Sequence, residues 1–442
     1  MGAVANRILI DLAPLRERPG FRLLFAASLV EVFGSQFTAV AIPFQVYALT
    51  RSSFQVGLVS LAQLIPLIIG ALIGGAVGDA VDRRRILVVT SLLLALTCGA
   101  LAANTLLAQP SLLAIYLVSA IAAGLGGMLS TASYAAVPAL VEPHQLVPAY
   151  AAIQVVDQVG MVVAPALAGL LIGAIHLHWV FALAGLSYLL TALTLLPIPP
   201  IPPASGAARP GLGSIMEGLR YLRGRPVLQG AYLIDINAMV FGMPRALFPA
   251  LATTVFGGGA SILGCLYAAP AAGALAGALT TGWLDRIRRQ ARAVIAAVCV
   301  WGAAIVAFGL VHVLWAALIL LAVAGWADVI SAVLRSTILQ SSVPEEFRSR
   351  MSSVQIAVVE GGPRLGDVES GAVASLVSTE FSIITGGLAC IAGAALLTAL
   401  LPAFRRYDRR SAPTSWPAAP PRRVGQAGPD RSPCPGSVRP PT

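Results

Sequence analysis

The chain has 442 residues, of which 57% are hydrophobic and only 11% are charged, and its mean hydropathy is +0.83. Soluble domains carry about 25% charged residues, so this composition excludes an ordinary soluble protein. The formal net charge is +10, and its positive charges all come from Arg, because the chain contains no Lys. Because these Arg residues cluster at the ends of apolar runs and in the C-terminal tail, we expect a protein of the lipid bilayer with no nucleic-acid partner.

The N-terminal segment, residues 1–21, contains Arg7, Arg16 and Arg18 and few apolar residues. It lacks the features of a cleavable signal peptide, so we expect the first apolar run to act as an uncleaved signal. Runs of about 20 apolar residues, long enough to cross a bilayer core of ~30 Å, then recur along the chain. The sequence predicts twelve spans, at residues 22–49, 54–78, 86–108, 111–134, 146–174, 178–198, 227–253, 259–283, 293–312, 314–334, 351–377 and 380–402.

These spans predict an all-α membrane protein with two pseudo-symmetric six-helix halves, at residues 22–198 and 226–404. Residues 199–225 lie between the halves and are rich in Pro, Gly and Arg, so they are predicted to be a cytoplasmic linker. Residues 405–442 are dense in Pro and Arg. Such a composition cannot form a core, and we expect a disordered cytoplasmic tail.

The placement of Arg predicts the orientation, because cytoplasmic loops carry an excess of basic residues. With the N-terminus in the cytoplasm, only Arg51 falls in an outer loop, while Arg245 and Arg364 fall within spans. The cytoplasmic side then receives the tail together with Arg7, Arg16, Arg18, Arg22, Arg83, Arg84, Arg85, Arg209, Arg220, Arg223, Arg225, Arg286, Arg288, Arg289, Arg292, Arg335, Arg348 and Arg350. This asymmetry predicts that both termini are cytoplasmic.

An internal repeat supports the division into two halves. The turn that contains Asp79 has a second version around Asp285, 206 residues later. Arg18 and Pro19 precede the first span as Arg225 and Pro226 precede the seventh, at an offset of 207. A near-constant offset indicates duplication in parallel orientation, which is a common plan of secondary transporters.

At the first of these turns the chain resembles the major facilitator superfamily of transporters. The pattern Gly75-x-x-x-Asp79-x-x-x-Arg83-Arg84 is similar to the signature loop between the second and third helices of that superfamily. The chain departs from the signature at Ala80 and Asp82, where a basic residue and Gly are usual.

Within the superfamily the chain is most similar to the enterobactin exporters and the macrolide-type efflux proteins. The segments that carry this similarity are Phe21-Arg22, Ala41–Pro43, Gln55–Gly57, Pro110–Leu117, Arg245–Ala252, Leu334–Gln340 and Gly361–Asp367. The resemblance covers about residues 10–405. It implies the twelve-helix fold and export, and it leaves the cargo open.

The two acid-and-Arg turns are candidate gates. Gly75, Asp79, Arg83 and Arg84 form the first, and Asp285 and Arg286 belong to the second. An Asp at such a helix end can accept hydrogen bonds from a neighbouring helix N-terminus, and an Arg can meet C-terminal carbonyl groups. By the resemblance, these turns latch the halves in one state; the alternative is a simple topology anchor.

Four acids inside spans are candidates for proton coupling or for lining the central cavity: Glu31, Asp157, Asp235 and Asp328. Glu31 and Asp235 lie nine and ten residues past Arg22 and Arg225, which places both roughly 14 Å into the first helix of their half. Intramembrane acids are costly and mark function by default. A carboxylate withdrawn from water can exchange a proton near neutral pH. The alternative is a satisfied polar residue in a water-filled cavity.

Span eleven contains an intramembrane charge cluster. Glu360 and Asp367 lie four residues before and three after Arg364, so both can reach it on one helix face, and Glu369 lies close by. A buried Arg needs such partners. We therefore expect a self-neutralised structural cluster more than a substrate site.

Span five contains a pattern of small residues around a proline. Gly160, Pro165 and Gly169 resemble the exporter-type helix bend of the superfamily, with Ala replacing Gly at two places. Small residues four apart let helices approach closely, so ordinary packing is the alternative. The resemblance favours export over import.

Motifs for catalysis are absent from the sequence. Without Lys there can be no Walker loop, and no HExxH or nucleophile elbow is present. The five Cys show no CxxC or Cys/His spacing, so we expect no metal and no cofactor. The sequence predicts a monomeric exporter of the bacterial inner membrane, not an enzyme, driven by proton antiport. Its expected cargo is a catecholate siderophore or a macrolide-like drug; an uptake permease and a non-transporting membrane scaffold are the alternatives.

Overall fold

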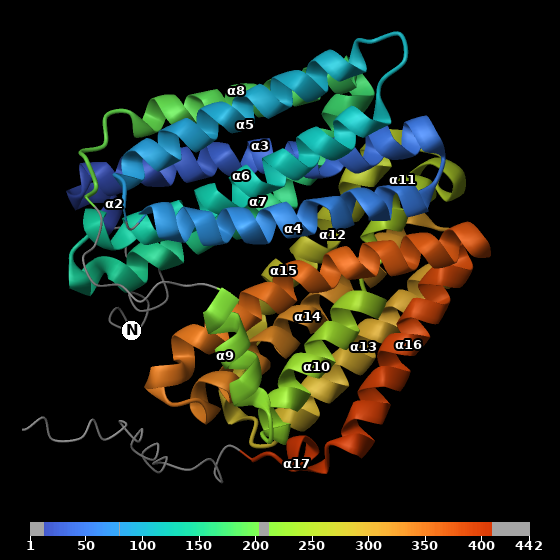
Figure 1. Ribbon diagram of the computed structural model, residues 1–442. Coiled ribbons are helices and arrows are strands. Elements are labelled where there is room, and N and C mark those ends of the chain that lie inside the picture. The colour runs from blue at the N-terminus through green and yellow to red at the C-terminus, as the bar shows by residue number, and fades with distance from the viewer. Residues whose placement is uncertain (1–12, 79, 203–211, 409–442) are drawn as a thin grey trace, which may run out of the picture.

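A computed structural model describes residues 13–78, 80–202 and 212–408 of the chain. Within these ranges the chain folds into helices and contains no strand (Figure 1). The first half contains α2 Ala13–Glu17, α3 Pro19–Thr50, α4 Ser53–Gly78, α5 Arg83–Thr105, α6 Leu112–Leu140, η1 Pro143–Gln145, α7 Leu146–Ile175 and α8 Leu177–Leu195.

The second half has a broken first span, in contrast to the first half. Its elements are α9 Leu212–Leu222, α10 Pro226–Phe241, η2 Arg245–Leu247, α11 Phe248–Ala250, η3 Leu251–Val255, α12 Gly259–Thr280, η4 Thr281–Arg286, α13 Gln290–Leu310, α14 Leu314–Ser342, α15 Glu345–Leu376, α16 Thr379–Leu400 and α17 Pro402–Arg405. The predicted seventh span is therefore interrupted, between Phe241 and Arg245. The predicted linker includes a helix, α9, and the tail from residue 409 onward lies outside the described ranges.

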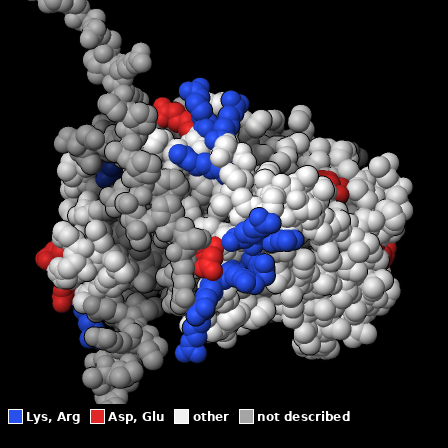
Figure 2. Space-filling view, turned by 90° about the horizontal axis from the view of Figure 1, so that it is seen from below, with Lys and Arg blue, Asp and Glu red and all other residues white. Residues whose placement is uncertain are grey.

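The surface of the molecule suits a bilayer. In the described part of the chain, eleven helical segments are long and apolar enough to cross a membrane. The twelfth long helix, α15, carries the charge cluster of span eleven and is more polar, so eleven of the twelve predicted spans meet this criterion and α15 does not. Large apolar side chains such as Ile65, Leu96 and Leu279 are exposed. In Figure 2 most of the visible face is uncharged, and the Arg side chains gather in a few clusters.

Glycines set how closely helices pack inside each half. A Cβ on Gly70 of α4 would lie 1.8 Å from the carbonyl oxygen of Gly124 in α6. In the second half, a Cβ on Gly273 of α12 would lie 1.8 Å from the carbonyl oxygen of Ala322 in α14. Only residues without a side chain permit such an approach. The pairs α4–α6 and α12–α14 hold equivalent places in the two halves, so the repeat seen in the sequence is also a repeat of packing.

The two halves meet mainly along two seams, α4 against α15 and α7 against α12. A Cβ on Gly57 would lie 2.3 Å from the carbonyl oxygen of Asp367, and one on Gly169 would lie 2.4 Å from that of Ala260. These contacts gather at one end of the bundle, where α3 and α7 finish and α4 and α12 start; we call it the closed end. Toward the opposite, splayed end the two groups of helices diverge (Figure 1).

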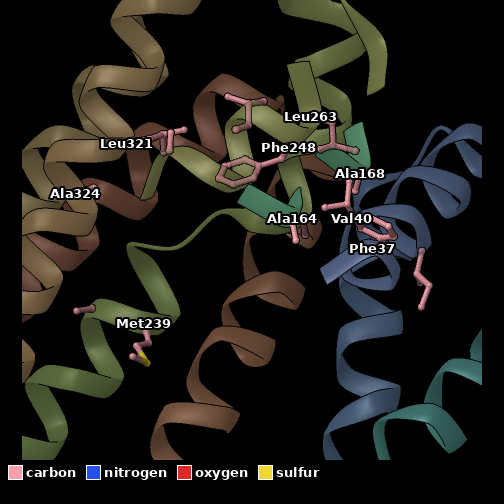
Figure 3. Packing of buried hydrophobic residues seen from close by; sticks show 14 of the residues in the cluster. Phe37, Val40, Ala164, Ala168, Met239, Phe248, Leu263, Leu321 and Ala324 are labelled. Atoms are coloured by element: carbon pink, nitrogen blue, oxygen red, sulfur yellow. The ribbon is translucent and has the colours of Figure 1, made fainter. Parts of the chain in front are cut away.

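The hydrophobic core is continuous across the closed end. Phe37 of α3 lies close to Ala164 and Ala168 of α7, and these lie beside Leu263 of α12 (Figure 3). Phe248 belongs to the same cluster and, like Leu263, to the second half. Burial of these side chains, at roughly 25 cal/mol per Å², therefore stabilises the contact between the halves as well as each half.

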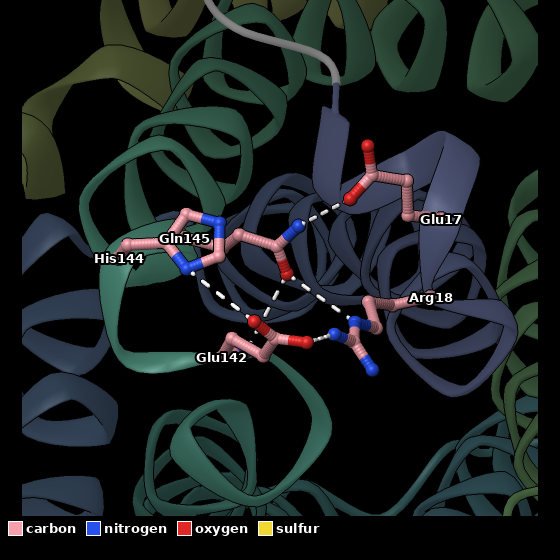
Figure 4. A network of polar contacts seen from close by, with 5 residues as sticks. All are labelled: Glu17, Arg18, Glu142, His144 and Gln145. Carbon is pink, nitrogen blue, oxygen red and sulfur yellow. Dashed lines mark hydrogen bonds and ion pairs between the residues drawn. The ribbon is translucent and has the colours of Figure 1, made fainter.

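The splayed end of the first half is tied by polar contacts. Arg18, just before α3, forms an ion pair with Glu142 and donates a hydrogen bond to Gln145 Oε1 at 3.4 Å (Figure 4). Gln145 Nε2 donates to Glu17 Oε2 at 2.7 Å, and His144 Nδ1 lies 3.4 Å from Glu142 Oε2. This network joins α2 and the start of α3 to the turn between α6 and α7.

A small apolar cluster holds the linker helix at the splayed end of the second half. The rings of Tyr221 in α9 and Phe347 in α15 are stacked with centroids 4.2 Å apart. Leu222 packs there with Met351 and Val354 of α15. The connection between the halves is thus attached to α15, the helix that also forms one of the two seams.

Candidate transport site

An ion pair is buried inside the second half. Asp235 of α10 and Arg335 of α14 are 1% and 3% exposed, and Arg335 Nη2 lies 2.7 Å from Asp235 Oδ1. Arg335 Nη1 donates to Ser331 Oγ at 2.8 Å, and Gln355 Nε2 of α15 donates to Asp235 Oδ2 at 3.5 Å. Burial of either charge alone would be strongly unfavourable, so each residue needs the other.

Arg335 is the residue of this pair that sequence analysis misses. The distribution of basic residues assigns it to the cytoplasmic side, whereas the structure buries it. The signal that could find it is its distance from the helix end. Seven residues, roughly 10 Å of helix, separate Arg335 from Ser342, where α14 finishes.

Asp328 lies on the same helix as Arg335, seven residues earlier, so the two face similar directions. Its charge interacts with those of Arg335, Asp235 and Arg245. In the described part of the chain, its Oδ1 atom is buried without a hydrogen-bond partner. The second half therefore groups two of the four predicted acids around one buried Arg.

A cavity of about 310 Å³ lies beside this group, between α10, α14 and α15. Tyr232, Ser336, Gln340 and Gln355 line it together with apolar side chains. Since Gln355 also bonds to Asp235, its side chain connects the cavity to the ion pair.

The other two predicted acids come together in the first half. Glu31 of α3 and Asp157 of α7 are half-buried, and their charges are close enough to interact. Tyr134 of α6 donates a hydrogen bond to Asp157 Oδ2 at 3.3 Å. In contrast to Asp235, neither carboxylate has an ion-pair partner among the residues that the structure describes.

A proline in α6 shapes this acidic group. Pro138 has no N–H, so the carbonyl group of Tyr134 loses its usual partner four residues later. Tyr150 donates its hydroxyl to that carbonyl at 3.2 Å, and the rings of Tyr134 and Tyr150 are stacked with centroids 6.3 Å apart. The two tyrosines therefore form one assembly next to Asp157.

The first candidate gate is partly described. Arg83 Nη1 donates to the carbonyl oxygen of Ala135 in α6 at 3.1 Å, and Arg84 donates to that of Leu196 after α8. Asp82 accepts the N–H of Ile201 at 2.9 Å, which ties this turn to the start of the linker. Asp79 lies outside the described residues, and Gly75 lies in the last turn of α4.

The second candidate gate has a different local structure. It forms the 3₁₀ helix η4, which contains Asp285 and finishes at the exposed Arg286. The side chain of Asp285 lies outside the described part of the molecule. A gating role for either turn remains a prediction.

The charge cluster of span eleven is divided in the structure. Arg364 Nη1 lies 3.0 Å from Glu360 Oε2, as the spacing predicts. Asp367 instead accepts the N–H of Ala246 at 3.0 Å, across the seam between α15 and the broken seventh span. Glu369 is half-buried further along the same helix. Arg364 thus pairs with one acid of the cluster, and Asp367 has a separate structural task.

The small residues of span five are contact points. α7 runs through Pro165 without interruption. A Cβ on Gly160 would lie 2.5 Å from Val32 of α3, and Gly169 packs on Ala260 and Gly264 of α12. Close packing explains these glycines, and their relation to export is a prediction.

No group of three His, Cys, Asp or Glu in the described ranges could hold a metal ion. The site offers charge and hydrogen bonding. One half has an acid pair without a basic partner among the described residues, and the other has a neutralised acid with a further carboxylate. Such an arrangement can bind and release protons and polar ligands.

Comparison with known proteins is consistent with this chemistry. Residues 10–426 match a family described as transmembrane secretion effector. The chain is 32% identical over 403 residues to the enterobactin exporter EntS of Citrobacter koseri, covering 90% of this chain and 96% of that protein. It is 31% identical over 411 residues to EntS of Salmonella typhimurium, with 92% and 98% covered.

Solved structures share the fold at lower identity. The nucleoside transporter NupG matches with a TM-score of 0.67 and 15% identity, covering 88% of this chain and 100% of that one. A bacterial homolog of the human lysosomal transporter Spinster matches with a TM-score of 0.64 and 17% identity, covering 87% and 95%.

Proposed function

Since this chain belongs to the major facilitator superfamily, as a multi-pass transporter of the transmembrane secretion effector family, we propose that it exports a catecholate molecule in exchange for protons. The bacterial inner membrane is its proposed location. The names of the relatives, which are enterobactin exporters, support this class of cargo. A monomer with two rocking halves, at residues 22–198 and 226–404, is sufficient for this task.

The acid pair of the first half carries the proposal. Glu31 and Asp157 interact with each other and have no ion-pair partner among the described residues. An ionised carboxylate within a membrane is costly unless something compensates its charge. A proton can do so, and so can hydrogen bonds from the hydroxyl groups of a catechol. Protonation makes the carboxyl group a weaker hydrogen-bond acceptor, so the proton and the catechol compete for it, and this competition is what antiport requires.

The ion pair of the second half has a different proposed task. Arg335 already compensates Asp235, so Asp235 gains little from a proton in this state. Among the four predicted acids, Glu31 and Asp157 are therefore the proposed proton carriers, with Asp328 as the third candidate. Asp235 instead fixes α10 against α14.

The orientation of the molecule gives this state a place in the transport cycle. Arg83 and Arg84, like Arg18, lie at the splayed end of the bundle. By the positive-inside rule this end faces the cytoplasm, as do both termini. The closed end then faces outward, and the structure corresponds to the state that loads cargo from the cytoplasm. Export would follow when the seams at Gly57 and Gly169 separate and the gates at Asp79 and Asp285 close.

Transport into proteoliposomes tests this proposal. Enterobactin is the cargo, a macrolide is the comparison cargo, and a pH gradient is imposed or omitted. We expect the gradient to drive enterobactin, and we expect Glu31→Gln to abolish that drive while leaving cargo exchange without a gradient. Glu217→Gln, an exposed acid of α9, is the matched control.

Each outcome decides one part of the proposal. Equal wild-type transport with and without the gradient would contradict proton antiport. Transport of the macrolide but not of enterobactin would contradict the catecholate cargo. Unchanged gradient-driven transport in both Glu31→Gln and Asp157→Asn would exclude the first-half acids as carriers.

A further inference from the structure

The break in the seventh span is supported by side chains from three other helices. Trp301 of α13 donates its Nε1–H to the carbonyl oxygen of Gly242 at 2.8 Å. Asp367 of α15 accepts the N–H of Ala246 at 3.0 Å, and Tyr267 of α12 donates to the carbonyl oxygen of Arg245 at 3.5 Å. Unsatisfied backbone groups at membrane depth cost several kcal/mol each. The surrounding helices therefore stabilise this interruption.

Glycines of α15 hold the end of α10 in place. A Cβ on Gly366 would lie 2.7 Å from the carbonyl oxygens of both Met239 and Val240, and one on Gly362 would lie 2.9 Å from the side chain of Met239. The last turn of α10 thus rests directly on the backbone of α15. Interrupted helices at this depth in transporters are found where the backbone lines a cavity or a binding site.

Arg245 is the first residue of η2 after the break and is exposed. It lies ten residues before Val255, the end of the span, which corresponds to roughly 15 Å of helix. Its charge interacts with Asp328 of α14, with Asp367 and with Tyr267. Since these groups come from three helices of the second half, the exposed side of Arg245 faces the region between the halves, where η2 also touches α4.

No acid among the described residues pairs with Arg245 directly. In the part of the chain that the structure describes, its guanidinium group has neither an ion pair nor a hydrogen bond. The carboxylate of Asp367 is engaged by Ala246. An intramembrane Arg without a direct ion pair is expensive, and such residues mark substrate or ion pathways. The break places this cation between the halves and leaves its donors available.

We infer that Arg245 binds the oxygens of a carboxylate group of the cargo. The inference rests on the proposed export function and specifies how the cargo is recognised. Guanidinium groups bind such oxygens through paired hydrogen bonds in fixed geometry. The cargo would then lie between two unlike walls: Arg245 holds its anionic group, and Glu31 and Asp157 accept hydrogen bonds from its hydroxyl groups. A neutral amide of the same shape could accept one hydrogen bond from Arg245, but it would lack the charge and the second acceptor oxygen.

A matched pair of probes tests this selectivity. 2,3-Dihydroxybenzoate carries a carboxylate, and 2,3-dihydroxybenzamide has nearly the same shape without the charge. Their dissociation constants are measured by calorimetry with the full-length protein in nanodiscs. A hydrogen bond to a charged group contributes about 1.5–3 kcal/mol, so we expect the wild type to prefer the acid by about 10-fold or more.

Variants distinguish the loss of the Arg245 charge from a loss of folding. We expect Arg245→Gln to lower the affinity for the acid much more than the affinity for the amide and so to remove the preference for the acid. Arg245→Lys should retain part of that preference. Arg51→Gln, which removes an exposed Arg beyond the end of α3, should keep the wild-type ratio. Thermal unfolding of each variant shows whether it is folded.

Two results would overturn the inference: a wild type that binds the acid no better than the amide, or an Arg245→Gln variant that keeps the wild-type ratio. Enterobactin transport is measured on the same preparations. A ratio that depends on Arg245 without enterobactin transport would support the anion site and contradict catecholate export. Enterobactin transport together with an acid-to-amide affinity ratio that does not depend on Arg245 would support catecholate export and contradict the anion site.

Discussion

Glu31 and Asp235 lie on α3 and α10, the first long helix of each half, and their surroundings are opposite in character. Asp235 is fully buried and paired with Arg335 at 2.7 Å. Glu31 is half-buried and has a second acid, Asp157, as its charged neighbour. The repeat has kept the backbone plan, while the chemistry of the two halves has diverged. The acid on the first long helix can bind a proton with little rearrangement in one half, and in the other half it is already compensated by an Arg.

The same contrast appears in the course of the two helices. α3 is continuous from Pro19 to Thr50 although Pro43 lies inside it. Its counterpart in the second half is divided into α10, η2, α11 and η3. Pro249, the equivalent of Pro43 at an offset of 206, lies inside the divided part. Pro249 therefore does not cause the break, which lies at Gly242–Pro244. Trp301 and Asp367 supply hydrogen-bond partners for the backbone groups that the break frees.

The largest effect is expected where the ion pair of the second half is disrupted. Asp235→Asn leaves Arg335 buried without its partner, which costs about 3–5 kcal/mol. We expect a strongly lowered midpoint of thermal unfolding in detergent, and recovery of most of the loss in the double variant Asp235→Asn with Arg335→Gln. Glu31→Gln should not be destabilised, because it leaves no basic partner behind among the described residues. Equal unfolding midpoints for Asp235→Asn and Glu31→Gln would remove the contrast between the halves.

The next effect concerns the seams that hold the halves together. Gly57→Ala places a methyl group 2.3 Å from the carbonyl oxygen of Asp367, and such overpacking costs about 1–3 kcal/mol. Because the strain falls on the closed end, we expect the population to shift toward the state open on that side. Solvent accessibility of a cysteine introduced at Ser53, measured by its labelling rate, reports the shift. Gly99→Ala, where a Cβ meets open space, is the control and should label as the wild type.

Much of the fold could be predicted from the sequence, because span length, Arg asymmetry and the repeat each have a direct physical cause. Which side chains of different helices contact one another could not be predicted from the sequence. Hydrophobic runs give the depth of a residue in the membrane but not the direction in which it points around its helix. The sequence therefore groups Arg335 with the cytoplasmic Arg residues, although it reaches Asp235 on another helix.

Spacing in the sequence also favours partners within the same helix over partners on other helices. The spacing of Asp367 to Arg364 predicts an ion pair within one helix, but Asp367 satisfies the backbone of Ala246 across a seam. The break that leaves this N–H free has no strong sequence signal, since Gly242 and Pro244 are residue types that also occur inside continuous membrane helices. For the candidate acids, the depth in the membrane could be predicted from the sequence, but the groups that compensate their charges could not.

A smaller effect separates the broken helix from its continuous counterpart. Trp301→Phe removes the hydrogen bond to Gly242 while keeping an aromatic ring, and we expect a loss of about 1 kcal/mol. Because the bond fixes the break, affinity for 2,3-dihydroxybenzoate should also fall. Calorimetry and thermal unfolding measure the two effects. Trp315→Phe, a change at an exposed Trp near the start of α14, should alter neither. Lost stability with unchanged affinity would show that the break does not position Arg245.

The smallest effect concerns the hydrogen bond that Tyr134 donates to Asp157 in the first half. Tyr134 donates to Asp157 at 3.3 Å, a long hydrogen bond at an exposed position, so Tyr134→Phe should change stability by only about 0.5 kcal/mol. Loss of this hydrogen bond leaves the negative charge of ionised Asp157 less stabilised. We therefore expect proton-driven transport to slow a few-fold while cargo exchange continues. Tyr150→Phe removes a bond to the backbone of Tyr134 and leaves the bond to Asp157 in place. Tyr150→Phe could also slow proton-driven transport more than Tyr134→Phe does. In that case the position of the Tyr134 ring matters more than its hydroxyl group. The acid pair of the first half would then depend on the packing around it, as Asp235 does in the second half.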